Sequence, residues 1–99
     1  MMHFRLSPEA FQDLTNIYEY IAQDNLEAAE RVRTEIYDAI LGLTAMPGKG
    51  HRREDLTRQP VLFWPVRSYQ IIYRPYSQPL QVVAILHGKR DIKRVLAPR

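Results

Sequence analysis

The chain of 99 residues contains no cysteine, only four glycines and no apolar run long enough to cross a bilayer. The absence of cysteine excludes disulfide bonds, thiolate metal sites and thiol nucleophiles. The few glycines form no phosphate-binding loop, and no nucleophile elbow or paired-carboxylate signature is present. The first residues also lack the features of a secretory signal. We therefore expect a cytoplasmic protein that uses no cofactor and does not enter a membrane.

Positive charge is scarce in the first half of the chain and abundant in the second. Residues 1–47 carry three cations against eight anions, a net charge of −5, whereas residues 48–99 carry eleven cations against three anions, a net charge of +8. Such asymmetry indicates that the basic half meets a polyanion or an acidic partner, unless it is simply a solvated surface of mixed charge. The length and the hydrophobic content of 45% are typical of one folded domain, expected to span residues 1–99.

The first half predicts a short strand and two helices. Residues 3–6 alternate polar and apolar side chains, as a strand does. Ser7 is a favourable N-cap and Pro8 a favourable first helical residue. Each helix has one apolar stripe, comprising Phe11, Leu14, Ile17, Tyr18 and Ile21 in the first and Ala29, Val32, Ile36, Ile40 and Leu43 in the second. The break at residues 24–25 is short, so the helices should form an antiparallel hairpin.

The second half predicts a loop followed by strands. Residues 48–60 are polar and have no clear period. Segments 61–66, 68–73 and 80–86 are rich in β-branched and aromatic residues, which favours an antiparallel meander. Pro65 cannot donate to a ladder, so its strand should lie at an edge or contain a bulge. With a short closing helix within residues 89–96, the predicted fold is α+β, with the hairpin packed on one face of the sheet. The first strand can pair at either edge.

Two patterns are candidates for chemistry. Three histidines, His3, His51 and His87, are far apart and lack the spacing of a metal site, so we expect no metal. Aromatic residues and arginines alternate through the strands, namely Phe63, Trp64, Arg67, Tyr69, Tyr73, Arg74 and Tyr76. Such mixtures can stack on bases and neutralise phosphates, but aromatic residues on strands also form cores.

For Phe63 and Tyr69 we expect the core, because so short a chain needs most of its large apolar side chains inside. Neighbouring side chains point to opposite faces of a strand. Tyr73 and Arg74 therefore cannot both point inward, and we expect Arg74 to face outward.

Four strings, in this order, resemble the RelE/ParE superfamily of bacterial toxins from type II toxin–antitoxin pairs: LSPEAFQDL, GHRREDL, SYQIIYRP, and ILHGKRD followed by RVL. The resemblance covers nearly the whole chain. It implies a cognate antitoxin whose C-terminal segment wraps around the toxin and masks it. RelE-like members are ribosome-dependent mRNA endonucleases, whereas ParE-like members poison DNA gyrase.

The catalytic residues that the RelE branch implies are incomplete in this chain. Arg90 matches the arginine of the GKR string. The other implied positions differ, with Gln70 in place of an arginine, Phe63 and Pro65 in place of lysines, and Leu96 in place of a tyrosine. An amide and a leucine can neither transfer protons nor balance phosphate charge. His87 could act as a base, but it has no obvious acid partner. The histidine before the glycine of ILHGKRD also resembles the ParE branch.

We therefore expect a ParE-like toxin that inhibits DNA gyrase, is neutralised by an antitoxin and has no enzymatic activity of its own. The expected target-binding residues are Arg67, Arg74, His87, Lys89 and Arg90. Two alternatives stay open. One is a RelE-like endonuclease that acts on mRNA at the ribosome through His87 and Arg90, and the other is a non-toxic module that only binds an antitoxin.

Overall fold

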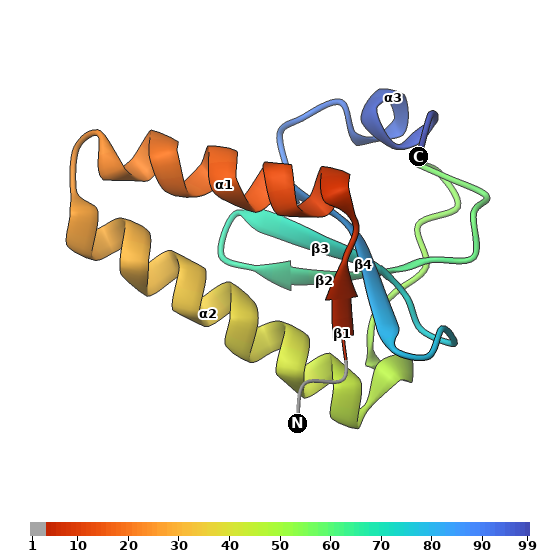
Figure 1. Ribbon diagram of the computed structural model, residues 1–99. Coiled ribbons are helices and arrows are strands. Elements are labelled where there is room, and N and C mark those ends of the chain that lie inside the picture. The colour runs from red at the N-terminus through yellow and green to blue at the C-terminus, as the bar shows by residue number, and fades with distance from the viewer. Residues whose placement is uncertain (1–3) are drawn as a thin grey trace.

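The computed structural model describes residues 4–99, which contain four strands and three α-helices. Their order is β1 (Phe4–Leu6), α1 (Pro8–Ala22), α2 (Leu26–Ala45), β2 (Leu62–Val66), β3 (Tyr69–Arg74), β4 (Leu80–His87) and α3 (Ile92–Leu96), with a 3-10 turn at Pro47–Lys49 (Figure 1). The predicted α+β fold is confirmed, including the closing helix. His3, which was expected to begin the first strand, lies outside the described residues.

Both helices of the hairpin begin at capped residues. The Ser7 hydroxyl accepts a hydrogen bond from the Ala10 N–H at 3.0 Å, and the Asn25 side chain accepts one from the Ala28 N–H at 2.9 Å. Each cap satisfies a backbone donor that has no partner within its helix. Because the second cap follows the end of α1 so closely, the chain must reverse there. The predicted antiparallel hairpin is therefore found, and Figure 1 shows α1 and α2 side by side in one layer.

The strand order of the sheet is β1-β4-β3-β2. The pairs β2–β3 and β3–β4 are antiparallel, as the meander predicted. β1 pairs with β4 in parallel, which decides the edge that the sequence left open. β2 is the other edge strand, in agreement with the position of Pro65. The segment before β2 is not all irregular, since His51 forms a β-bridge with Phe63.

The hairpin covers one face of the sheet with a continuous apolar core. Its buried residues are Ala10, Leu14, Val32, Ile36, Ile40 and Leu43 from the helices and Ile71, Tyr73, Val82 and Ile85 from the strands. The expectation for Phe11 was wrong, because its side chain is 59% exposed. Phe11 is one residue, about 100° of helix rotation, beyond Ala10, and the small Ala10 takes the inward position instead.

The opposite face of the sheet has a second core that the sequence did not reveal. Ile92 and Leu96 of α3 pack there on Phe63 and Val83, together with Leu56 from the segment before β2. The Gln59 side chain donates a hydrogen bond to the Leu96 carbonyl at 3.0 Å, which joins that segment to α3. β4 is consequently buried on both faces, which explains why its sequence reads as a continuous apolar run.

Tyr73 links the sheet to the end of the hairpin. Its ring is fully buried, while its hydroxyl donates to the Pro47 carbonyl at 2.6 Å and accepts from the Gly50 N–H at 3.0 Å. A Cβ atom at Gly50 would lie 2.6 Å from that hydroxyl, so the contact requires glycine. Arg74, the next residue, is only half-buried and points to the other face, as predicted.

Replacing Ile36 by alanine should lower the free energy of unfolding by about 2–5 kcal/mol, because the side chain is fully buried between the hairpin and the sheet. Urea denaturation measures the change. Leu41→Ala is the matched control on the same helix, since Leu41 is 45% exposed and its truncation should cost less than about 1 kcal/mol. Equal losses at the two positions would show that the buried face of α2 is assigned incorrectly.

Replacing Tyr73 by phenylalanine should lower the free energy of unfolding by about 1–3 kcal/mol, because the Gly50 N–H and the Pro47 carbonyl both lose their partner. Tyr76→Phe provides the control, because Tyr76 is 88% exposed. Thermal denaturation of both variants should show a lower melting temperature for Tyr73→Phe alone. Unchanged stability in Tyr73→Phe would contradict the assigned hydrogen bonds.

Candidate target-binding site

Four of the five expected target-binding residues lie at one end of the sheet. Arg67 is in the turn between β2 and β3, His87 ends β4, and Lys89 and Arg90 follow it in the loop to α3. Tyr69 at the start of β3 pairs with His87, so this turn and this loop meet. Arg74 ends β3 instead, five residues and about 17 Å from Tyr69. The structure therefore separates Arg74 from the other four, which we call the target patch.

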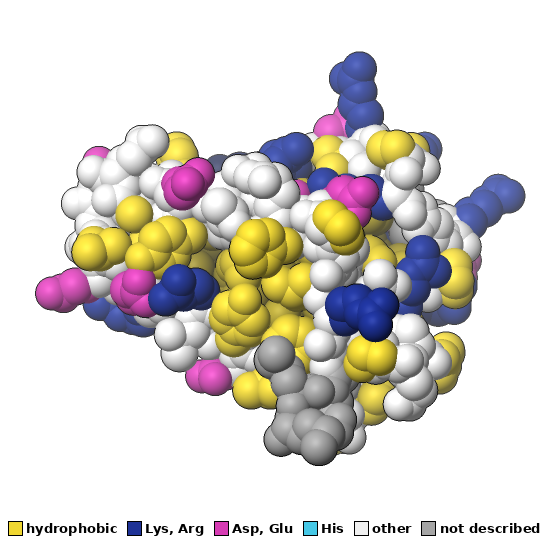
Figure 2. All heavy atoms as spheres, viewed as in Figure 1, with side chains coloured by type: hydrophobic (Ala, Val, Ile, Leu, Met, Phe, Trp, Pro, Cys, Tyr) yellow, Lys and Arg dark blue, Asp and Glu magenta, His cyan; other side chains and the backbone are white. Residues whose placement is uncertain are grey.

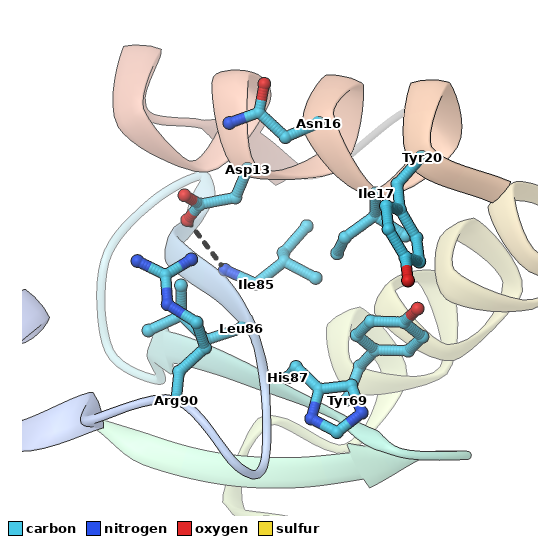
Figure 3. A pocket seen from close by; sticks show the side chains of 9 residues that line it. All are labelled: Asp13, Asn16, Ile17, Tyr20, Tyr69, Ile85, Leu86, His87 and Arg90. Atoms are coloured by element: carbon cyan, nitrogen blue, oxygen red, sulfur yellow. Dashed lines mark hydrogen bonds between the residues drawn. The ribbon is translucent and has the colours of Figure 1, made fainter. Parts of the chain in front are cut away.

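A pocket of about 420 Å³ opens beside the target patch, between α1 and the ends of β3 and β4. Its lining comprises Asp13, Asn16, Ile17 and Tyr20 from α1, Tyr69 from β3, and Ile85, Leu86, His87 and Arg90 from β4 and its loop (Figure 3). In Figure 3 the hydroxyl groups of Tyr20 and Tyr69 point toward one another on one side of the pocket. Tyr69, which was expected in the core, is partly buried and packs against the hairpin core at this wall of the pocket.

The loop after β4 is a tight turn that carries two exposed cations, of which Arg90 also lines the pocket (Figure 3). The Gly88 N–H donates to the Ser68 carbonyl at 2.8 Å, and the Arg90 N–H donates to the His87 carbonyl at 2.9 Å. These bonds hold the loop against the β2–β3 turn and fix the register of Lys89 and Arg90. Both side chains are exposed, and neither forms an ion pair with any residue in the range 4–99.

His87 is oriented by two contacts. Its ring meets Tyr69 edge-on, with 5.5 Å between centroids and 85° between planes. Its Nδ1 accepts a hydrogen bond from the Lys89 N–H at 3.0 Å, which places the proton of the neutral ring on Nε2. Burial raises the pKa of the Tyr69 phenol, and the neighbouring Tyr20 raises it further. The Tyr69 hydroxyl therefore stays protonated near neutral pH and can donate a hydrogen bond into the pocket.

Arg67 is held in an unusual backbone conformation. Its φ is 54°, in the left-handed region that costs a residue with a Cβ about 1 kcal/mol. Its guanidinium donates two hydrogen bonds to the Glu35 carboxylate of α2, at 2.6 and 2.7 Å. These bonds lower the pKa of the Glu35 carboxyl and raise that of Arg67. Arg67 thus ties the β2–β3 turn to the hairpin.

Asp13 is the residue at this site that sequence reasoning missed. It is buried, and its Oδ2 accepts from the Ile85 N–H at 3.0 Å and from Arg99 Nη1 at 2.6 Å, while Oδ1 accepts from Arg99 Nη2 at 3.1 Å. β1 ends at Leu6, opposite Val82, so no residue of β1 reaches the Ile85 N–H of β4. The Asp13 carboxylate binds this N–H in place of a longer strand. The sequence feature that indicates a buried role for Asp13 is its position within the apolar stripe of α1, three residues after Ala10.

The positions at which the RelE branch implies catalytic residues do not form a reactive group. Phe63 and Leu96 are buried in the second core, and Pro65 is exposed on the edge strand opposite Gln70. His87 and Arg90 do line the same pocket.

Residues 4–99 contain no group of three His, Cys, Asp or Glu side chains that could hold a metal ion. His51, one of the three histidines, stacks on Trp64 at 6.2 Å between centroids.

Comparisons with known proteins agree with this fold. A solved chain described as part of the chromosomal ParDE TA system from P. aeruginosa superposes with a TM-score of 0.71, covering 88% of this chain and 96% of that chain at 20% sequence identity. A search of curated protein sequences gave no significant match. Residues 4–92 match the family model described as "ParE toxin of type II toxin-antitoxin system, parDE". The chain therefore belongs to the ParE family of toxins from type II toxin–antitoxin systems.

Proposed function

We propose that the chain inhibits DNA gyrase and is neutralised by a cognate antitoxin, as the ParE branch implies. The observation that carries this proposal is the family match over residues 4–92. The similar fold of a chain from a ParDE system supports it. An antitoxin partner follows from the two-component nature of the family. Gyrase acts on DNA in the bacterial cytoplasm, which is therefore the proposed location. Within residues 4–99, no helix is both long and apolar enough to span a bilayer.

The proposed contact with the target is the target patch, Arg67, His87, Lys89 and Arg90. Lys89 and Arg90 are exposed cations on a loop that backbone hydrogen bonds have already ordered, so binding costs little conformational entropy there. The adjoining pocket is lined largely by apolar and aromatic side chains and can take one anchoring side chain of the partner. A charged rim beside an apolar pocket is a common arrangement at protein interfaces.

The endonuclease alternative has one observation in its favour, the shared pocket of His87 and Arg90. Cleavage by the 2′-hydroxyl of RNA needs a base, an acid and cations around the phosphate. Burial of Phe63 and Leu96 removes two of the positions from which helpers would come. The gyrase proposal therefore ranks first, and the third possibility, a non-toxic antitoxin-binding module, is an outcome of the experiments below.

Reversing the charge of Arg90 should weaken inhibition of gyrase at least about tenfold, because a repulsive carboxylate would replace a contact worth at least about 1.4 kcal/mol. The assay measures supercoiling of relaxed plasmid by purified gyrase at increasing concentrations of the Arg90→Glu variant. The melting temperature should not change, because the Arg90 side chain has no ion-pair partner within the described residues.

Arg31→Glu serves as the control, because it changes the net charge equally on the exposed surface of the hairpin. It should inhibit gyrase like the unaltered chain. If both variants inhibit normally, Arg90 is not a contact, and if both lose inhibition equally, net charge rather than the target patch controls binding.

Pulse-labelling of DNA, RNA and protein synthesis in bacteria, minutes after induction without antitoxin, identifies the target process. We expect DNA synthesis to fall first while protein synthesis continues. An immediate arrest of protein synthesis would favour the endonuclease and make His87→Ala the next variant to test. Normal synthesis of all three polymers would show that the chain has kept the toxin fold and lost its toxicity.

A further inference from the structure

A second basic surface lies on the face of the sheet opposite the hairpin. Arg5, Gln81 and Arg74 form a row across three strands, because Arg5 pairs with Gln81 and Gln81 pairs with Arg74. Their immediate neighbours in the strands pack into the hairpin core, so this row points to the side of α3. Arg5 is exposed and Arg74 half-buried.

α3 contributes two further cations to the same side. Ile92 and Leu96 anchor the helix in the second core, which leaves Lys93 and Arg94 exposed on its outer side. The hydrogen bond from Gln59 to the Leu96 carbonyl holds the preceding segment against α3. Arg58, the neighbour of Gln59 in the chain, is exposed at this border. We call Arg5, Arg58, Arg74, Lys93 and Arg94 the α3 face.

The cations of the α3 face are not neutralised by acids. None of the five forms an ion pair with another residue of the part that the structure describes. The two acids of the segment before β2 pair with arginines outside the α3 face, Glu54 with Arg52 at 3.4 Å and Asp55 with Arg53 at 2.9 Å. Two acids reduce the local charge. Glu9 borders the hollow that Arg74 lines, and Asp91 caps α3 through the N–H of Arg94, which leaves its negative charge in place.

The opposite side of the molecule has the reverse character. Most acids of the first half lie on α1 and α2, and Figure 2 shows Asp and Glu side chains over the hairpin and more Lys and Arg side chains toward α3 and the segment before β2. The composition alone also allowed a surface on which both charges are mixed. The fold instead places most acids on one side of the molecule and most cations on the other.

We propose that the α3 face binds the phosphate backbone of duplex DNA without sequence preference. Protein partners are usually anchored by exposed aromatic or aliphatic side chains, and those of α3 are buried, with Ile92 5% and Leu96 1% exposed. Single strands need exposed aromatic residues for stacking. Among the described residues, the large exposed aromatic side chains are Phe11 and Tyr20 on the hairpin and Tyr76 in the β3–β4 connection, two residues after Arg74. One tyrosine at the border of the α3 face cannot stack a series of successive bases. Dispersed, unpaired cations without such anchors suit a surface of regularly spaced phosphates.

The α3 face is separate from the target patch, and the proposal does not depend on gyrase being the target. If gyrase is the target, as proposed above, a second surface that holds the same DNA also raises the local concentration of the toxin at its target. The α3 face supplies that second contact, and it does so with long, flexible side chains that follow a phosphate backbone of any sequence.

The experiment measures binding of the purified full-length chain to a fluorescein-labelled duplex of about two helical turns by fluorescence anisotropy. Salt is varied between about 50 and 200 mM. Each phosphate contact should contribute about 0.9 to the slope of log Kd against log salt, so three to five contacts give a slope of about 3 to 4.5. Absence of binding at the lowest salt, or binding that salt does not weaken, overturns the proposal.

Two double variants with the same net charge decide whether the α3 face is responsible. Lys93→Glu with Arg94→Glu should weaken binding at least about tenfold and lower the salt slope by about 2. The control variant, Arg31→Glu with Arg33→Glu, replaces two exposed arginines of α2 and changes the net charge of the chain by the same amount. It should weaken DNA binding less than about threefold. Equal weakening in both variants would show that net charge alone binds DNA, and would contradict the proposal.

Three competitors separate duplex DNA from other polyanions. Unlabelled duplex should displace the probe at lower concentration than polyglutamate, single-stranded RNA or vesicles with anionic lipid. Stronger competition by any of these three overturns the choice of ligand in favour of an acidic peptide, RNA or a membrane. If the glutamate variant of α3 unfolds, as thermal denaturation would reveal, Lys93→Gln with Arg94→Gln replaces it, with at least about fivefold weaker binding expected.

Discussion

Burial of β4 on both faces is the constraint on which the rest of the structure depends. Its eight residues are packed by the hairpin on one side and by α3 with the segment before β2 on the other. Burial of apolar surface stabilises a fold by about 25 cal/mol per Å². Because β4 buries apolar side chains on both faces, it contributes more to stability than an edge strand can. Its two neighbours, β1 and β3, are positioned by pairing with it, and the loop that carries Lys89 and Arg90 begins where it ends.

The candidate site is built from this strand's ends rather than from a catalytic constellation. Asp13 satisfies the β4 backbone beyond the end of β1 and bonds Arg99, so the pocket wall is held by a bidentate ion pair of low exposure. Such charge-assisted bonds are stronger and more directional than neutral ones. Opposite it, Arg67 and Glu35 tie the β2–β3 turn to α2. That pair is exposed and contributes little stability.

The separation of charge is a consequence of packing. The acidic first half forms the hairpin layer, and the basic second half forms the sheet, its loops and α3. Because the apolar residues of both halves meet in the middle, their charged residues are directed to opposite surfaces. The target patch and the α3 face are two parts of the basic side that differ in kind, since only the former adjoins an apolar pocket. This difference is the reason that a protein partner is proposed for the target patch and phosphates for the α3 face.

The sequence by itself determined the helices and the meander, because capping residues, apolar periodicity and turn residues act over a few neighbours. The toxin family was indicated separately, by four strings that resemble the RelE/ParE superfamily, and the family match over residues 4–92 shows it. It also located Pro65 on an edge strand and the cations of the β4–α3 loop. It misjudged Phe11, because Ala10 and Phe11 differ by one helix position and only the packing shows which faces the sheet. The parallel pairing of β1 with β4, the second core under α3, the bond from Asp13 to Arg99 and the separation of Arg74 from the target patch were decided only by the tertiary structure. The first three join residues far apart in the chain, and local propensity carries no information about which distant segments will meet. The fourth depends on which end of the sheet the β4–α3 loop reaches, which the pairing of β3 with β4 decides.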